Sequence, residues 1–228
     1  DPDFSNTPTP NPEEKGAYEL ALQYAKKADA DIILVCDPDA DRMGVGVKHK
    51  GEYVLLTGNQ SGTVLIEYIF SQLKAKGEMP PHPVMFKTVV TSDLGEKIAA
   101  KYGVETEKTL TGFKFIGEKV AQYEINNEKQ YVFGYEESYG SLISPFVRDK
   151  DAPQACLMLA EAACYYKAQG KTLVDVLYGL YEELGYYEES QTSLTLTGQA
   201  GAERIKAILT DLRNSDLSHI KGTKVVKM

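Results

Sequence analysis

The residues best suited to chemistry form the hexapeptide 37–42, Asp-Pro-Asp-Ala-Asp-Arg, which directly follows the apolar run 32–36. A short β-branched run predicts a buried strand, and open α/β sheets place their ligands at the C-terminal ends of strands. Asp37, Asp39 and Asp41 repel one another, and the usual remedy is a hard divalent cation that takes oxygen ligands. The loop therefore predicts a Mg²⁺ site.

Other interpretations of this loop fare differently. An EF-hand requires Gly at the sixth position and Glu at the twelfth, whereas Arg42 and Lys48 stand there, so that interpretation fails. A phosphatase with an aspartyl nucleophile explains two alternate aspartates but not the third or Arg42. Arg42 beside carboxylates suits a phosphate, which arginine binds in bidentate fashion. The alternative without a functional role is a solvated acidic turn in which Arg42 is an ion-pair partner.

Composition bounds the class of protein. The 228 residues are 43% hydrophobic and 25% charged, as in an ordinary globular protein with room for a real core, and we expect two lobes. The net charge of -8 and the lack of a basic face argue against nucleic acid as a partner. No apolar run is long enough to cross a bilayer, so we expect no membrane association.

The cysteines and the chain start suggest where the protein works and what it is part of. Cys36, Cys156 and Cys164 lie in apolar sequence without a CxxC pair, which predicts buried thiols in a reducing compartment and a cytoplasmic protein. The chain opens on Asp1-Pro2-Asp3-Phe4, without Met or a signal peptide. This opening favours a piece cut from a longer protein, or a processed one.

The elements that position the acidic loop come from the first third of the chain. After an extended lead-in, Asn11 is predicted to cap a helix that begins at Pro12, with an apolar stripe through residues 17–28. The strand 31–36 delivers the loop. Strands 43–49 and 52–56 form a hairpin around Lys50-Gly51, and a polar capping turn at 57–63 opens a helix that ends near Lys76.

The remainder alternates strands with helices, which predicts a parallel sheet with right-handed crossovers. After a linker marked by three prolines, the expected elements are a strand 84–90, a helix 92–102, a strand 104–106, a helix toward 123, a strand 131–133, a helix from about 153, a strand 193–197, a helix 199–214 and a strand from 224. The expected fold class is therefore α/β: mixed, mostly parallel sheets sandwiched by helices in three layers.

Two further polar loops follow predicted strands. In the first, Thr111 and the Gly112 N–H are able to face an anion, with Lys114 as the counter-charge. In the second, residues 134–140, Glu136 and Ser138 suit the reading of sugar hydroxyls, because carboxylates accept from hydroxyls and a serine both donates and accepts. Each signal is weak alone.

A charged run, Arg148-Asp149-Lys150-Asp151, follows the second loop. In order and rough spacing, these four motifs resemble those of the α-D-phosphohexomutases, and in particular the bacterial phosphoglucomutase/phosphomannomutase type. The resemblance covers nearly the whole chain from Asn11 onward. It implies the three-layer α/β/α domains of that family and a hexose phosphate as substrate.

The resemblance also implies roles for individual residues. Asp37, Asp39 and Asp41 would coordinate Mg²⁺, and Arg42 would stand close to the phosphorylated centre. Glu136 and Ser138 would hold the sugar 3- and 4-hydroxyls. The remaining residues would line the substrate cleft; they are Thr111, Gly112, Lys114, Arg148 and Lys150.

Parts of the family pattern are absent. The phosphorylated serine and the C-terminal phosphate-binding loop have no counterpart here, which implies the end of the second family domain at 1–57, the third at 58–189, and a linker with the start of the fourth at 190–228. The other domains of the parent chain would then be its partners. Some relatives carry a histidine where Gly140 stands, and Lys150 becomes the candidate for proton transfer or leaving-oxygen stabilisation.

Three functional hypotheses remain open. The first is the metal-binding and sugar-reading part of a mutase that interconverts glucose 1-phosphate and glucose 6-phosphate through a phosphoserine and a bisphosphorylated sugar, inactive as a piece. The second is a Mg²⁺-dependent sugar-phosphate phosphatase with Asp37 as nucleophile. The third is a non-catalytic domain that binds sugar phosphates.

Overall fold

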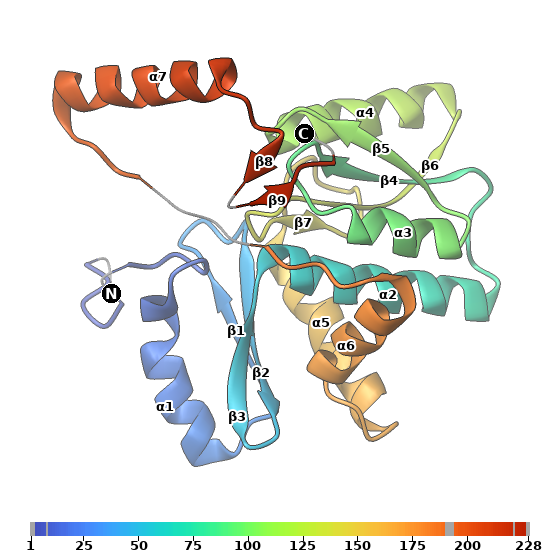
Figure 1. Ribbon diagram of the computed structural model, residues 1–228. Helices are drawn as coiled ribbons and strands as arrows, with labels where there is room; N and C mark the ends of the chain where they lie inside the picture. Colours follow the sequence, from blue (N-terminus) through green and yellow to red (C-terminus); the bar gives the residue numbers. More distant parts are fainter. Residues whose placement is uncertain (1–2, 8, 190–193, 221, 227–228) are drawn as a thin grey trace. The chain divides into compact units, whose positions relative to one another are not determined.

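The computed structural model describes residues 3–7, 9–189, 194–220 and 222–226. The chain divides into two compact units, Asp1–Tyr187 and Glu188–Met228, and each is described by itself. The larger unit contains both a three-stranded and a four-stranded sheet (Figure 1). All the residues that the sequence singles out for chemistry belong to it.

The helices of the larger unit follow the hydrophobic periodicity of the sequence. They are a 3₁₀ turn η1 (Lys15–Tyr18), α1 (Glu19–Ala28), α2 (Gly58–Lys76), α3 (Leu94–Lys101), α4 (Phe113–Asn126), α5 (Ala152–Lys167) and α6 (Leu173–Leu184). Its strands are β1 (Ile32–Cys36), β2 (Met43–His49), β3 (Glu52–Leu56), β4 (Pro83–Thr88), β5 (Glu105–Thr109), β6 (Gln130–Tyr135) and β7 (Ser141–Leu142).

The three-stranded sheet is antiparallel throughout, in the order β1-β2-β3. Lys50 and Gly51 join β2 to β3 with φ angles of 50° and 87°, which is the left-handed backbone that two-residue hairpin turns require. The predicted hairpin is confirmed. The acidic loop 37–42 likewise joins β1 to β2, in which Cys36 lies opposite Met43.

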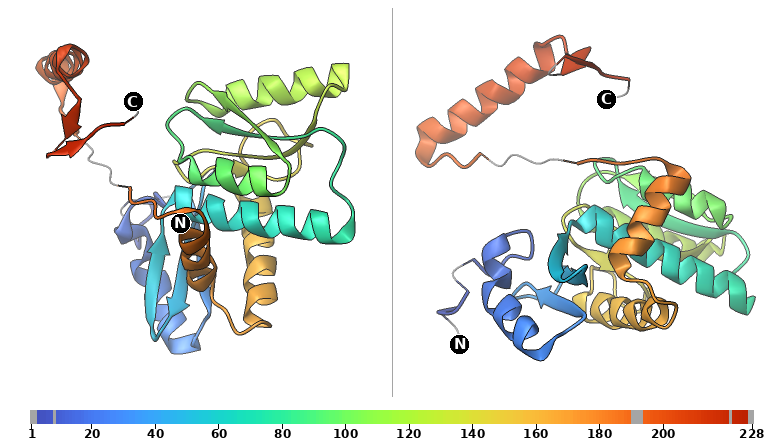
Figure 2. Two further views of the ribbon diagram at one scale, coloured as in Figure 1. Left: turned by 45° about the vertical axis from the view of Figure 1, so that its right-hand side comes forward. Right: turned by 60° about the horizontal axis from the view of Figure 1, so that its bottom comes forward.

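The four-stranded sheet has the order β5-β4-β6-β7, with β4 parallel to both of its neighbours and β7 antiparallel. Helix α4 covers one face, and α2 and α3 lie on the other (Figures 1 and 2). The expected α/β class with mixed sheets and helix layers is confirmed. The parallel pairs are those of β4 with β5 and β6, and the other strand pairs of the described residues are antiparallel, so the sheets are mixed rather than mostly parallel.

Alternation along β4 shows how the sheet is packed on both faces. Val84 and Phe86 contact the α4 side, whereas Met85 belongs to the core shared with α2 and α3. This second core continues to Val45 and Val47 of the three-stranded sheet and to α5 and α6. A single apolar core thus spans the two sheets, so the acidic loop and the four-stranded sheet belong to one compact unit.

The start of the chain corrects one expectation. The Asn11 side chain accepts from the Glu13 N–H at 3.1 Å, but the α-helix begins only at Glu19, so Asn11 is not its N-cap. The Asn11 carbonyl accepts from the Glu14 N–H at 2.9 Å, as in a tight turn, and the Pro12 carbonyl accepts from the Tyr18 hydroxyl at 2.9 Å. The residues before Glu19 therefore form a turn and the 3₁₀ segment η1 instead of an α-helix.

The exposure of the cysteines corrects a second expectation. Cys36 and Cys164 are exposed and Cys156 is half-buried, so the prediction of buried thiols is wrong. Cys36 ends an edge strand of the three-stranded sheet, and Cys164 lies on the outer side of α5.

The smaller unit contains α7 (Gly198–Asn214) and a two-stranded pair, β8 (His219–Ile220) with β9 (Thr223–Lys224). The predicted helix 199–214 is confirmed. The strand predicted at 193–197 is not formed over residues 194–197, which hold no regular structure, and residue 193 lies outside the described residues. Of the strand predicted from 224, β9 contains Lys224, and residue 227 is not described.

Candidate functional site

Asp37 organises the acidic loop from within. Its side chain is buried, and one oxygen accepts from the backbone N–H groups of Asp41 at 3.1 Å and Arg42 at 3.0 Å. Its other oxygen accepts from the Arg42 Nε at 2.6 Å. Ala40 turns the chain with φ of 56°, a left-handed conformation that is costly for alanine and that these contacts maintain.

The three aspartates of the loop form an oxygen-rich group. One carboxylate oxygen from each of Asp37, Asp39 and Asp41 lies within 4.8 Å of the others. Asp37 is buried, Asp41 is half-buried and Asp39 is exposed. Hard cations such as Mg²⁺ prefer carboxylate oxygens and keep several waters, so this donor set, open on the Asp39 side, fits such an ion.

The surroundings of the loop shift the pKa values of Asp37 and Asp41 in opposite directions. Burial by itself would raise the pKa of Asp37, but the hydrogen bonds from the Arg42 backbone and guanidinium lower it overall. Burial raises the pKa of Asp41, in spite of the hydrogen bond from Lys150. The ionised form of Asp37 is therefore favoured, whereas Asp41 depends on the Lys150 ammonium to oppose its protonation.

Lys150 joins the acidic loop to the loop after β6. Its Nζ lies 2.9 Å from Asp41 Oδ2 and 3.8 Å from Glu136 Oε2, and its side chain is only 17% exposed. Burial alone would lower the pKa of Lys150, but these carboxylates raise it, so the side chain is a cation at neutral pH.

The stem of Lys150 runs across Gly140. A Cβ at residue 140 would lie 2.1 Å from the Lys150 Cδ, so any larger residue there would displace the lysine stem. In this chain the space beside the glycine is taken by Lys150.

Backbone contacts fix the two loops against each other. Arg42 forms an isolated antiparallel bridge with Gly140, and the Met43 N–H donates to the Tyr139 carbonyl at 3.0 Å. The Ala152 N–H at the start of α5 donates to the Ala40 carbonyl at 3.0 Å. The acidic loop and the loop after β6 are thus parts of one site.

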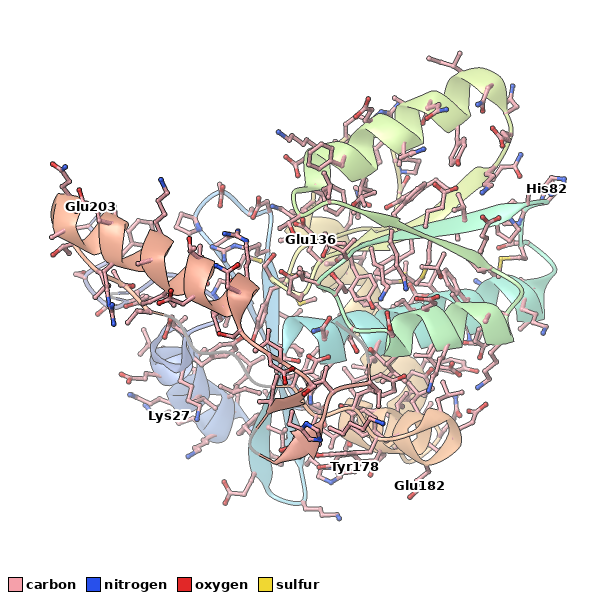
Figure 3. All side chains as sticks on the ribbon, turned by 45° about the horizontal axis from the view of Figure 1, so that its top comes forward. Lys27, His82, Glu136, Tyr178, Glu182 and Glu203 are labelled. Carbon is pink, nitrogen blue, oxygen red and sulfur yellow. The ribbon has the colours of Figure 1, made fainter. Side chains whose placement is uncertain are left out.

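Glu136 lies at the C-terminal end of β6, at the opposite end of the sheet from His82, which precedes β4 (Figure 3). It is buried, and its Oε1 accepts from the Gly112 N–H at 3.1 Å. Burial raises its pKa, which the Lys150 charge and the Gly112 hydrogen bond partly oppose. A buried carboxylate with a free oxygen lone pair is able to accept from a ligand hydroxyl.

The structure therefore brings part of the predicted site together. A chain of direct contacts links six of the predicted residues: Asp37, Asp41, Arg42, Lys150, Glu136 and Gly112. Asp39 completes the oxygen cluster, and Ser138 is half-buried on the same loop as Glu136.

Besides Asp39 and Ser138, three predicted residues lie outside that contact chain. Thr111 and Lys114 are exposed, and the Lys114 ammonium lies 4.9 Å from the Phe115 ring centroid. Arg148 is exposed and pairs with Glu124 of α4 and the Pro145 carbonyl. Their side chains are exposed, whereas those of Asp37 and Glu136 are buried.

The sequence reasoning missed two groups that support the site. Arg42 Nη1 donates to Asn11 Oδ1 at 3.2 Å and to Glu13 Oε1 at 3.0 Å, so the chain start orients the guanidinium. Glu137 accepts from the hydroxyls of Thr88 at 3.1 Å and Thr91 at 3.0 Å. The acid next to Glu136, and hydroxyls at the end of β4, were the available signals for the second group.

Lys87 is another side chain that sequence reasoning missed. It is fully buried at the end of β4, and its Nζ donates to the carbonyls of Thr91 at 2.9 Å and Ser92 at 3.0 Å and to Asp93 Oδ1 at 2.5 Å. Burial lowers its pKa, although Asp93 opposes the shift. Lys87 thereby fixes the turn whose Thr91 hydroxyl contacts Glu137.

Within the part of the chain that the structure describes, every helix is too short or too polar to cross a bilayer.

Comparison with known families matches two stretches of the chain. Residues 57–184 match the model described as "Phosphoglucomutase/phosphomannomutase, alpha/beta/alpha domain III", and residues 1–51 match the one described as domain II. Strand β3 lies between the two matches, which end at residue 51 and begin at residue 57. The acidic loop therefore lies in the second-domain match, and Glu136 and Lys150 lie in the third-domain match.

Comparison with individual proteins finds relatives of the same family. A phosphoglucomutase of Staphylococcus aureus (strain USA300) is 38% identical over 226 residues, which is 99% of this chain and 40% of the relative. Among solved structures, the open form of the Paramecium phosphoglucomutase parafusin has a TM-score of 0.60 at 22% identity, over 94% of this chain and 36% of its own. A Burkholderia thailandensis phosphoglucomutase/phosphomannomutase family protein has a TM-score of 0.54 at 17% identity, over 75% and 33%. The chain spans about 40% of the length of the curated relatives it matches.

Proposed function

Because the chain belongs to the phosphoglucomutase/phosphomannomutase family, we propose that it is the metal-binding and sugar-reading part of a phosphohexomutase. The proposed reaction of the whole enzyme is the Mg²⁺-dependent interconversion of glucose 1-phosphate and glucose 6-phosphate. A phosphoserine would donate the phosphoryl group, and a bisphosphorylated sugar would be the intermediate. Other domains of a longer chain would supply the phosphoserine and the second phosphate-binding loop, so we expect this chain to be inactive alone.

The observation that carries this proposal is the contact path from Asp41 through Lys150 to Glu136. It joins a carboxylate cluster suited to a hard cation with a buried carboxylate suited to sugar hydroxyls, over two distances of 2.9 Å and 3.8 Å. A mutase needs both functions at one centre, because the transferred phosphoryl group departs from or arrives at a sugar oxygen.

Mg²⁺ would be held by Asp37, Asp39 and Asp41, and it would neutralise charge on the transferred phosphoryl group. Arg42, oriented by Glu13 and Asn11, would bind the phosphoryl oxygens from the same loop.

Glu136 and Ser138 would form hydrogen bonds with the sugar hydroxyls. The sugar must be held in two orientations, and a carboxylate that accepts from vicinal hydroxyls serves in both. Gly112 keeps one oxygen of Glu136 engaged, which fixes the direction of the other. Thr111, Lys114 and Arg148 are exposed and would bind the non-reacting phosphate or the sugar edge.

Lys150 is the proposed residue for proton transfer or stabilisation of the leaving oxygen. Its ammonium lies between the carboxylate cluster and the sugar-reading carboxylate, where the reacting oxygen would be. Gly140 leaves the space that the lysine stem requires.

The test is the conversion of glucose 1-phosphate by the full-length protein that contains this sequence, with Asp39→Asn as the variant. Asp39 is the exposed ligand, so its loss should remove activity without unfolding the loop. Asp29→Asn is the matched control, since Asp29 is exposed at the end of α1 and forms its ion pair with Lys48 of β2, away from the acidic loop. Equal activity in both variants would overturn the assignment of the loop.

A further inference from the structure

Two cysteines distant in sequence meet at the base of the acidic loop. Cys36 is the last residue of β1 and is exposed, and Cys156 lies in the second turn of α5 and is half-buried. Their Sγ atoms are 3.5 Å apart and both thiols are free. No part of the proposed reaction uses either thiol.

We propose that Cys36 and Cys156 form a redox-modification site, in which a peroxide-class oxidant converts the two thiols to a disulfide that ties β1 to α5. The proposal is independent of the proposed function, because it depends only on the positions of the two sulfur atoms.

The chemistry balances in two steps. The Cys36 thiol attacks hydrogen peroxide, giving a sulfenic acid and one water as the O–O bond breaks. The Cys156 thiol then attacks that sulfur, forming the S–S bond and releasing a second water. Two thiols are oxidised by two electrons and one peroxide is reduced.

The order of the steps follows from exposure. Burial raises the pKa of the Cys156 thiol to about 12, and the nearby Cys36 sulfur adds to the shift. Cys156 is therefore the slower thiol to meet an oxidant from solvent, and Cys36 is the one that reacts first.

The backbone around the pair supports closure. A disulfide requires an S–S distance of about 2.05 Å, so the sulfur atoms must approach by roughly 1.5 Å. The segments that carry them are already joined where the Ala152 N–H donates to the Ala40 carbonyl at 3.0 Å. Cys164 is two turns further along α5, about 12 Å along the helix axis from Cys156, so it cannot substitute for it.

The first experiment treats the chain with hydrogen peroxide under native conditions, blocks the remaining thiols and maps the disulfides by peptide mass spectrometry. We expect one Cys36–Cys156 disulfide and one free thiol of the three cysteines, with full reversal by dithiothreitol. Cys164→Ser is the matched control and should leave the disulfide unchanged, whereas Cys36→Ser and Cys156→Ser should abolish it.

Two results would overturn the proposal. One is over-oxidation of Cys36 to the sulfinic acid without a Cys36–Cys156 bond, which would show that the thiols do not meet. The other is a mixture of pairings that includes Cys164, as expected from an unfolded chain; a urea-denatured sample provides that reference pattern.

A consequence for activity rests on the proposed function. Because Asp37 follows Cys36 directly, closure of the disulfide shifts the base of the acidic loop. We expect peroxide to lower mutase activity of the full-length protein at least threefold, with recovery in dithiothreitol and no loss in Cys156→Ser. A mapped disulfide with unchanged activity would refute this consequence alone. A protein without mutase activity before oxidation would count against the proposed function and leave the mapping result intact.

Discussion

Replacing Lys150 by methionine tests the link between the two loops. Methionine retains an unbranched stem beside Gly140 but removes the charge that Asp41 and Glu136 share. At an effective dielectric constant of 20, charges 2.9 Å apart attract by about 6 kcal/mol before desolvation is counted. A charge-assisted hydrogen bond retains about 1.5–3 kcal/mol after desolvation, and we expect the free energy of unfolding to fall by about 2 kcal/mol at pH 7.

The sign of the pH dependence follows from the two carboxyl groups. Burial already raises the pKa values of Asp41 and Glu136, and loss of the Lys150 cation raises them further. Once protonated, these groups no longer need a cation. The stability difference between Lys150→Met and the unmodified chain should therefore be largest at neutral pH and should shrink as the pH falls through the raised pKa values.

The assay is urea unfolding of both chains at several pH values, with Lys26→Met on the exposed surface of α1 as control. In the same experiment Mg²⁺ should stabilise the Lys150→Met chain more than the unmodified chain, because the lysine competes with the ion for Asp41. Stability equal to that of the control at pH 7, or a loss that grows on acidification, would refute the reasoning.

Three further predictions follow, two for the surroundings of the site and one for strand β5 of the four-stranded sheet. Gly58→Ala should destabilise the fold by about 3 kcal/mol in urea unfolding, since a Cβ there would lie 2.1 Å from the Glu137 carbonyl oxygen; a neutral effect would contradict this contact. Thr91→Val should cost about 1–2 kcal/mol and raise KM for the sugar phosphate, because Glu137 loses a hydrogen bond; an unchanged KM would remove Glu137 from the positioning of the loop. Burial alone would raise the pKa of Glu107, but contacts with Lys129 and Tyr123 lower it, so Glu107→Gln should destabilise the chain above about pH 4.3 and approach the unmodified stability below it; a pH-independent difference would argue against the ion pair.

The acidic loop was predictable because its signal is local. Asp37, Asp39 and Asp41 alternate directly after an apolar strand, and the reasoning from repulsion to a cation needs no knowledge of distant residues. The alternation of residue types and the Lys50-Gly51 turn also identified the β2–β3 hairpin, since the turn and its two strands are adjacent in sequence. The structure adds that β1 and β2 are antiparallel, so the loop is itself a hairpin connection.

The contacts between distant segments were not predictable in this way. Nothing in the sequence states that Lys150 crosses Gly140, or that Glu13 reaches Arg42, because these contacts depend on how the two sheets share a core. The exposure of Cys36 has the same origin, since an apolar strand at a sheet edge is buried on fewer sides than one inside a sheet.

Helix α6 was missed for a different reason. Its local signals were present: Thr172 and Asp175 form a capping box, and Leu173, Val176 and Leu180 are buried at helical spacing. These signals are local, so the helix was predictable from the sequence although none was predicted there. The N-terminal helix was misplaced because the contact from the Tyr18 hydroxyl to the Pro12 carbonyl arises only in the folded chain.

The most direct test of the central claim identifies the product that is formed from glucose 1-phosphate. Phosphorus NMR of the full-length protein with Mg²⁺ distinguishes glucose 6-phosphate from inorganic phosphate in one sample, and the isolated chain of residues 1–228 serves as the second sample. We predict glucose 6-phosphate from the full-length protein, none after Mg²⁺ is chelated, and no turnover by the isolated chain. Inorganic phosphate from either sample, without glucose 6-phosphate, would contradict the mutase assignment and favour a phosphatase.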